Sequence, residues 1–263
     1  MSIHFQHNNT GIALLQVNRP QQRNALNWAT QEAFAEAVTA VAHNPAIRVL
    51  IITGSGPHAF VSGGDLKELS QHSAPSTGQR LYHTMNQALR QLTQLPIPVL
   101  AAVNGDAFGG GCEILTACDI RLAAPHARFS FAQIRNGLTT GWGGTGRLVR
   151  LIGHSRAMEL LLTGRIFSAS EAQQIGLIHR VLEADEDLLT AVYTTAAELS
   201  QLPRQALASL KSLVYTASTH DLETTNQREA ELFAQLYAQP DHLEALNAFL
   251  EKRPPNFNQP LDN

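Results

Sequence analysis

The chain has 263 residues, of which 44% are hydrophobic and 16% charged, and its formal net charge is −3. These values are typical of a globular protein with one sizeable core and exclude a disordered chain. No run of lysine and arginine is present, which argues against a nucleic-acid-binding protein. No apolar stretch approaches the roughly 20 residues that span a bilayer, and no secretory signal is predicted, so we expect no membrane association.

The two cysteines, Cys112 and Cys118, are six residues apart in one predicted helix and would lie on roughly opposite sides of it. That geometry disfavours a disulfide between them. We therefore expect a reducing, cytoplasmic setting. The histidines are scattered without the spacing of metal ligands, so no metal site is predicted.

Strands and helices alternate through the first two-thirds of the chain. Asn27 is the predicted N-cap of a helix whose apolar face includes Phe34 and Val38. A second helix is predicted over residues 81–95, whereas residues 54–61 and 75–78 are predicted to be loops. The predicted strands are residues 3–5, 12–17, 49–52, 99–103 and 120–123, the first two paired through a turn at 8–11.

From residue 155 onward the pattern is mainly helical. Alternating strands and helices followed by helices alone indicate an α/β core, residues 1–200, with a helical C-terminal region, residues 201–263. Residues 168–171 are a predicted capping segment. The later predicted helices are residues 188–199, 204–214, 222–237 and 243–250.

Two glycine-rich junctions between a strand and a helix carry the strongest chemical signal. Residues 99–103 are followed by glycines at 109–111 and by a helix that contains Glu113. Such a junction exposes backbone N–H groups that suit an anion, or an oxygen that becomes negative during a reaction. Residues 62–65, which include Gly64, form a second junction. Either junction alone is explained equally well by a turn that needs glycine, but together they could offer two N–H donors to one carbonyl oxygen.

A third glycine-rich segment, with Gly141, Gly143 and Gly146, matches the letters of a dinucleotide-binding fingerprint. It lacks the preceding strand and the first strand–helix position that the fingerprint requires. We interpret it as a tight turn that allows close backbone packing.

These segments together resemble the crotonase superfamily of enoyl-CoA hydratases and isomerases, over about residues 12–257. The matches, in the family's order, are residues 18–20, 23–26, 59–69, 104–119, 143–145, 147–148, 162–164, 172–177 and 249–257. The resemblance implies the ClpP/crotonase spiral of ββα units, with the acyl-CoA site in residues 1–200 and a trimerisation region in residues 201–263. It implies a homotrimer or a dimer of trimers, with coenzyme A entering as part of the substrate and no separate cofactor or metal.

The resemblance also implies roles for individual residues. The N–H groups of Gly64 and Gly110 would hold the thioester oxygen, and Glu113 would act as acid and base. The expected contacts with coenzyme A are Arg23, Ala25 and Ser62, with Phe249 and Lys252 supplied by a neighbouring subunit.

The chain departs from the hydratase pattern at Gln133, which stands where the second catalytic glutamate is expected. An amide can orient water but is no acid or base near neutral pH, and losing one proton-transfer group typically removes a factor of about 10²–10⁴. Three reactions stay open: hydration with one glutamate, isomerisation, and decarboxylation of a methylmalonyl- or ethylmalonyl-type CoA thioester. Residues 115–119 and 139–144 are similar to those of decarboxylating members.

Arg135 and Trp142 are two further candidate site residues. Arg135 could pair with a substrate carboxylate, although a solvated surface arginine is the simpler reading. Trp142 is expected either to line the acyl pocket or to lie in the core. The alternative to an enzyme is a non-catalytic binding member of the superfamily. If it bound RNA, a basic patch would be expected, and the sequence does not offer one.

Overall fold

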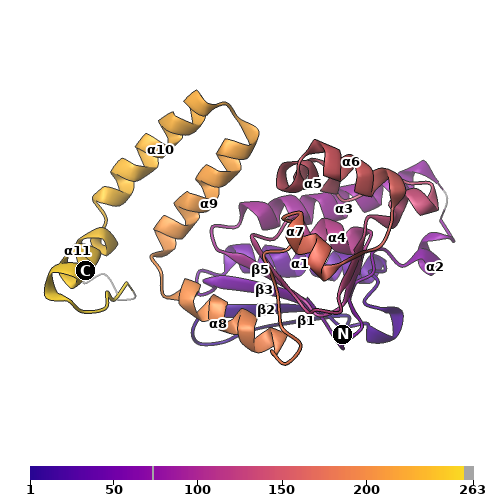
Figure 1. The fold of residues 1–263 in the computed structure, drawn as a ribbon, viewed down its shortest axis with the longest axis horizontal. Coiled ribbons are helices and arrows are strands. Elements are labelled where there is room, and N and C mark those ends of the chain that lie inside the picture. The colour runs from indigo at the N-terminus through magenta and orange to yellow at the C-terminus, as the bar shows by residue number, and fades with distance from the viewer. Residues whose placement is uncertain (73, 258–263) are drawn as a thin grey trace.

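The computed structural model describes residues 1–72 and 74–257. Two β-sheets lie at the centre of the fold and are surrounded by helices (Figure 1). The strands are β1 (Ile3–His7), β2 (Ile12–Val17), β3 (Val49–Gly54), β4 (Ala59–Val61), β5 (Val99–Val103), β6 (Asp106–Phe108), β7 (Ile120–Ala123), β8 (Arg128–Ser130), β9 (Phe167–Ser168) and β10 (Arg180–Val181). In the described residues the larger sheet has the order β1-β2-β3-β5-β7-β10 and the smaller has the order β4-β6-β8-β9.

Helices follow most of the strands, as expected for repeated strand–helix units. Two predicted caps are confirmed, because the side chain of Asn27 accepts a hydrogen bond from Thr30 N and that of Ser168 accepts one from Glu171 N. The helices are α1 (Trp28–His43), α2 (Leu66–Leu69), α3 (Pro75–Gln94), α4 (Gly110–Leu115), α5 (Gly144–Ile152), α6 (His154–Thr163), α7 (Ala169–Gln174), α8 (Leu188–Ser200), α9 (Arg204–Thr219), α10 (Leu222–Tyr237) and α11 (Pro240–Glu251), with short 3₁₀-helices η1 (Pro20–Gln22) and η2 (Ala132–Asn136).

The larger sheet is covered on both faces, which explains the unbroken apolar run of β3. Leu50 and Ile52 lie in the main core with α1, whereas Val49 and Ile51 belong to a second apolar cluster with Val192 of α8. Strands β2, β3, β5, β7 and β10 pair in parallel, and β1 and β2 form the predicted antiparallel hairpin. Parallel strands buried on both sides carry apolar residues at every position rather than at alternate ones.

The structure corrects two loop predictions. Residues 54–61 are not all loop, because Ala59–Val61 forms β4 and pairs in parallel with β6. The segment 75–78 is not a loop either but the first turn of α3, with Pro75 at a position where its missing N–H costs nothing. The sequence pattern also misses strand β6. It predicts a loop between β5 and the glycines at 109–111, where the structure has this short strand.

The helices α9, α10 and α11 extend away from the α/β core (Figure 1). Helix α8 ends at Ser200, and α9 begins at Arg204. Lys211 of α9 is tied to the core by an ion pair of 2.7 Å with Asp119. Large apolar side chains on this region are exposed, including Val214, Phe233 and Phe249. Exposed apolar groups gathered on one region are typical of an interaction surface.

Cys112 and Cys118 are both free and buried. Within residues 1–72 and 74–257, no helix is both long enough and apolar enough to cross a bilayer.

Candidate active site

The two glycine junctions meet at one edge of the smaller sheet. Strands β4 and β6 pair side by side, so the segments that leave their ends toward α2 and α4 are neighbours. A methyl group built on Gly63 would lie 3.2 Å from Gly110 N. Within the described part of the chain, the N–H groups of Gly64 and Gly110 donate no hydrogen bond. Two unused backbone donors therefore lie close together at this edge.

The glycines of the second junction leave no room for a side chain. A methyl group on Gly110 would lie 2.2 Å from the ring of Trp142, and one on Gly111 would lie 1.8 Å from Val61 O. Contacts this short are not tolerated, and the carbonyl of Val61 cannot easily move aside because its strand, β4, is buried and paired with β6. Glycine is thus required at 110 and 111 because neighbouring atoms come too close for any side chain, and not only because glycine has a flexible backbone.

Replacing Gly111 with alanine should lower the free energy of unfolding by about 3 kcal/mol or more, because the new methyl group overlaps Val61 O. The matched control is Gly146→Ala on α5, where an added methyl group meets nothing within 4 Å. Alanine there should leave stability unchanged or raise it by about 1 kcal/mol. Urea denaturation of both variants checks this, and equal midpoints for Gly111→Ala and the parent protein would refute it.

Glu113 projects from α4 into a buried cradle of N–H donors. Its side chain is buried, and its carboxylate accepts four hydrogen bonds from N–H groups. Oε1 accepts from Gln133 Nε2 at 2.8 Å and from Gly141 N at 3.0 Å. Oε2 accepts from Trp142 N at 2.8 Å and from Gly144 N at 2.7 Å. Burial raises the pKa of the Glu113 carboxyl, and these four donors act against that rise because they stabilise the ionised form.

The turn at residues 141–144 has a function that the sequence interpretation missed. It is a tight turn, as expected, but the N–H groups of Gly141, Trp142 and Gly144 form the cradle for Glu113. Gly143 has φ +77°, and a methyl group on Gly144 would lie 2.6 Å from Glu113 Cγ. The available signal was the run of glycines before a helix, which exposes consecutive N–H groups to an anion.

Gln133, on η2, lies directly beside Glu113. Its amide also faces the first glycine of the junction, since a methyl group on Gly109 would lie 3.9 Å from Gln133 Cδ. With Nε2 donating to Glu113, Oε1 is buried and has no hydrogen-bond partner among the described residues. The structure therefore brings together Glu113, Gln133 and the segments of Gly64 and Gly110.

Comparison with known proteins places this chain in a family. The family model described as enoyl-CoA hydratase/isomerase matches residues 7–260. The chain belongs to the enoyl-CoA hydratase/isomerase family. It is 39% identical to a crotonyl-CoA hydratase of Syntrophomonas wolfei over 247 residues, 94% of each chain. It is 36% identical to a short-chain-enoyl-CoA hydratase of Clostridium acetobutylicum over 242 residues, 92% of each chain.

Solved structures of the enoyl-CoA hydratase/isomerase family confirm the predicted crotonase-like α/β fold. An enoyl-CoA hydratase from Bacillus anthracis superposes with a TM-score of 0.93 at 33% identity, covering 98% of this chain and 99% of that one. A Mycobacterium smegmatis enoyl-CoA hydratase gives the same TM-score at 31% identity, covering 98% of this chain and all of the other. The match extends through the helical C-terminal region, because nearly the whole chain is covered.

The residues that the family resemblance assigns to coenzyme A fall into two groups. Arg23, Ala25 and Ser62 lie together beside the first junction: Ser62 N donates to Arg23 O at 3.2 Å, and Ala25 is buried next to Leu26, whose N–H bonds Gly63 O. Arg23 itself is exposed and 3.7 Å from Asp106. In contrast, Phe249 and Lys252 lie at the end of α11, which is remote from α4 in the single chain (Figure 1).

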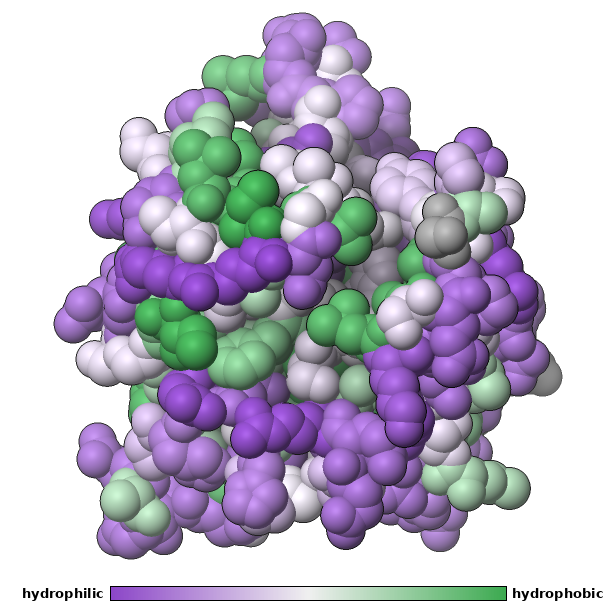
Figure 2. Space-filling view, turned by 90° about the vertical axis from the view of Figure 1, so that its right-hand side faces the viewer, coloured by the Kyte–Doolittle hydropathy of each residue, from purple (hydrophilic) through white to green (hydrophobic). Residues whose placement is uncertain are grey.

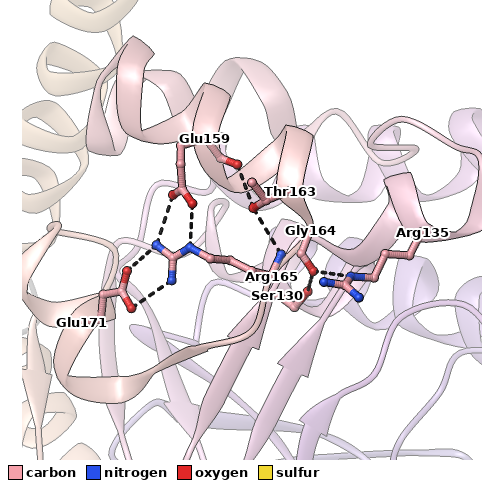
Figure 3. A network of polar contacts seen from close by, with 7 residues as sticks. All are labelled: Ser130, Arg135, Glu159, Thr163, Gly164, Arg165 and Glu171. Atoms are coloured by element: carbon pink, nitrogen blue, oxygen red, sulfur yellow. Dashed lines mark hydrogen bonds and ion pairs between the residues drawn. The ribbon is translucent and has the colours of Figure 1, made fainter.

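The remaining sequence-based candidates have structural contacts. Arg135 donates from Nε to Gly164 O at 2.8 Å, and Ser130 Oγ donates to the same carbonyl (Figure 3). Trp142 is buried against Gly110.

The end of the molecule that carries α2 is a largely polar face with apolar patches and a hollow near its middle (Figure 2).

Proposed function

We propose that this protein is an acyl-CoA enzyme that forms a thioester enolate, with Glu113 as its acid and base. The observation that carries the proposal is a buried carboxylate held by four N–H donors next to two unused backbone amides. In this proposal the thioester oxygen accepts hydrogen bonds from Gly64 N and Gly110 N, which stabilise the negative charge that develops there.

Hydration of an enoyl-CoA is the first candidate reaction. The oxygen of water bonds to Cβ while one of its protons passes to Glu113, and the electron pair of the double bond moves through Cα toward the thioester oxygen. Glu113 then returns that proton to Cα, which restores the carboxylate and completes the addition of water. Gln133 Oε1, which accepts no hydrogen bond from the described residues, is suited to accept one from the attacking water.

Decarboxylation of a methylmalonyl- or ethylmalonyl-type thioester is the second candidate, and Gln133 favours it. Breaking the bond between Cα and the carboxylate releases CO₂ and leaves its electron pair in the enolate, so no base is needed. One proton donor then completes the reaction at Cα. A single carboxyl whose pKa is raised by burial, beside a neutral amide, is sufficient for this chemistry.

We further propose the setting of the enzyme. Coenzyme A enters as part of the substrate, and the protein works in the cytoplasm as a homotrimer or a dimer of trimers. Residues 201–263 would form the trimer contacts, which the exposed apolar side chains of α9–α11 support, although residues 258–263 lie outside the described residues. Phe249 and Lys252 would then reach the coenzyme A site of a neighbouring subunit.

Crotonyl-CoA, methylmalonyl-CoA and ethylmalonyl-CoA assayed side by side test the proposal. Loss of the enoyl group of crotonyl-CoA with formation of a hydroxyacyl product is expected for hydration, and CO₂ release from the malonyl-type thioesters for decarboxylation. Hydration that is unchanged in Gln133→Ala would remove the role of Gln133 in positioning water. Salt-sensitive RNA binding without turnover of any thioester would instead favour a non-catalytic binding protein.

The activity should depend on pH through Glu113. If Glu113 acts as the base, only its ionised form is active, so kcat/KM should rise with pH through its pKa. Because burial raises that pKa, the acid limb should lie above the ordinary glutamate value of about 4.3. A pH profile with crotonyl-CoA checks this. An acid limb at or below the ordinary value would contradict it.

A further inference from the structure

Arg147 of α5 contacts both segments that frame Glu113. Its Nη2 donates to Trp142 O at 2.9 Å and lies 3.5 Å from Glu113 O, at the limit of a hydrogen bond. Its Nε donates to Thr116 Oγ1 at 3.0 Å, and Thr116 Oγ1 donates in turn to Glu113 O at 2.7 Å. One guanidinium thereby joins the turn at 141–144 to the helix that carries Glu113.

The residue held most directly is Trp142. Its N–H donates to Glu113 Oε2, and its carbonyl accepts from Arg147, so both polar groups of its backbone are fixed. Displacement of this residue would weaken the donors on either side of it, because Gly141 N and Gly144 N belong to the same turn. The planar fork of arginine can bond two elements at once, which the single ammonium of lysine cannot reproduce.

Within the described part of the chain, the charge of Arg147 has no partner carboxylate. Among the described residues it forms no ion pair, although its side chain is half-buried. The charged and titratable groups around this part of the site are Cys112 of α4, Cys118 and Asp119 beyond the end of α4, Tyr82 of α3, Arg150 of α5 and Glu113 itself. Asp119 is already paired with Lys211 at 2.7 Å, whereas the guanidinium charge of Arg147 favours the ionised form of Glu113.

We propose that Arg147 is a positioning residue for Glu113, which holds the turn at 141–144 so that its N–H groups meet the carboxylate. This inference rests on the proposed role of Glu113 in proton transfer. In this proposal Arg147 acts through its contacts with Trp142 and Thr116 rather than on the reacting atoms. It acts by fixing where the carboxylate lies and by keeping it ionised.

The variants that test this are Arg147→Lys and Arg147→Met, with Arg150→Met as the matched control. Arg150 is the next arginine of α5, and both arginines line one surface cavity. We expect kcat to fall about 10- to 100-fold in both Arg147 variants, since small misplacements of a catalytic group cost that much. KM should change little. The acid limb of kcat/KM should move to higher pH, because weaker N–H donors raise the pKa of Glu113.

A second measurement does not depend on turnover. Hydrogen–deuterium exchange at the amides of residues 141–144 should become faster in Arg147→Met and stay unchanged in Arg150→Met. Unchanged exchange and unchanged kcat in Arg147→Met would overturn the inference. Slower turnover with an unmoved pH limb and unmoved exchange would do so as well. If the parent protein turns over no acyl-CoA, the proposed function fails, and the exchange experiment still decides whether Arg147 holds the turn.

Discussion

Glu113→Gln should lower kcat by about 10²–10⁴-fold, the usual contribution of one acid or base. The substitution keeps the shape of the side chain but removes its ability to take or give a proton. It also places an NH₂ group where the parent has a carboxylate oxygen. That group cannot accept from the N–H donors, so the variant loses at least one of the four hydrogen bonds. KM should change far less, because the residues expected to bind coenzyme A are elsewhere.

Steady-state kinetics with crotonyl-CoA and the malonyl-type thioesters check this result. The control is Glu229→Gln on the exposed face of α10, which removes the same charge far from the site. Circular dichroism shows whether both variants keep the fold. A Glu113→Gln protein that is folded and retains kcat within threefold of the parent would show that Glu113 is only a structural anion.

Gln133→Glu should raise the rate of crotonyl-CoA hydration by about 10-fold or more, because it restores a second group for proton transfer. The new carboxylate would lie where Gln133 Nε2 now lies, 2.8 Å from Glu113 Oε1. Two carboxylates this close cannot both ionise freely, so the pair should share a proton and titrate in two steps. We therefore expect a bell-shaped pH profile in place of a single acid limb.

The control for this gain is Gln133→Met, which keeps the length of the side chain but offers no acid, base or amide. It should not hydrate crotonyl-CoA faster than the parent. Full pH profiles of kcat/KM for both variants are needed, because the glutamate pair titrates differently from Glu113 alone. Hydration by Gln133→Glu that is no faster than the parent at every pH would contradict the placement of Gln133 at the second acid–base position.

Much of the fold was predictable because long segments signal their structure locally. The buried run at 49–52, the cap at Asn27 and the helix at 222–237 each follow from residue pattern alone, and the structure confirms them. Strands β4 and β6 could not be predicted in the same way. Each has three residues, and what makes each a strand is its pairing with the other, which is distant in the sequence.

The site was predictable in its parts but not in its connections. Glycine junctions indicated two backbone donors, and Glu113 stood beside one of them. Nothing in the spacing of Gln133, 20 residues further along, fixes its contact with Glu113, and only the family resemblance pointed to it. The glycine pattern at 141–144 predicts only a tight turn, because a sequence does not reveal which group the N–H donors of the turn face.

The central claim is that Glu113 transfers a proton at Cα of a thioester whose enolate the protein stabilises. The most direct measurement is the exchange of the Cα protons of butyryl-CoA with deuterated water, followed by NMR. This reaction requires neither hydration nor loss of CO₂, so it tests enolate formation by itself. We predict exchange with the parent protein and a loss of at least about 100-fold in Glu113→Gln. Exchange that is equally fast in both proteins, or absent from both, would contradict the account.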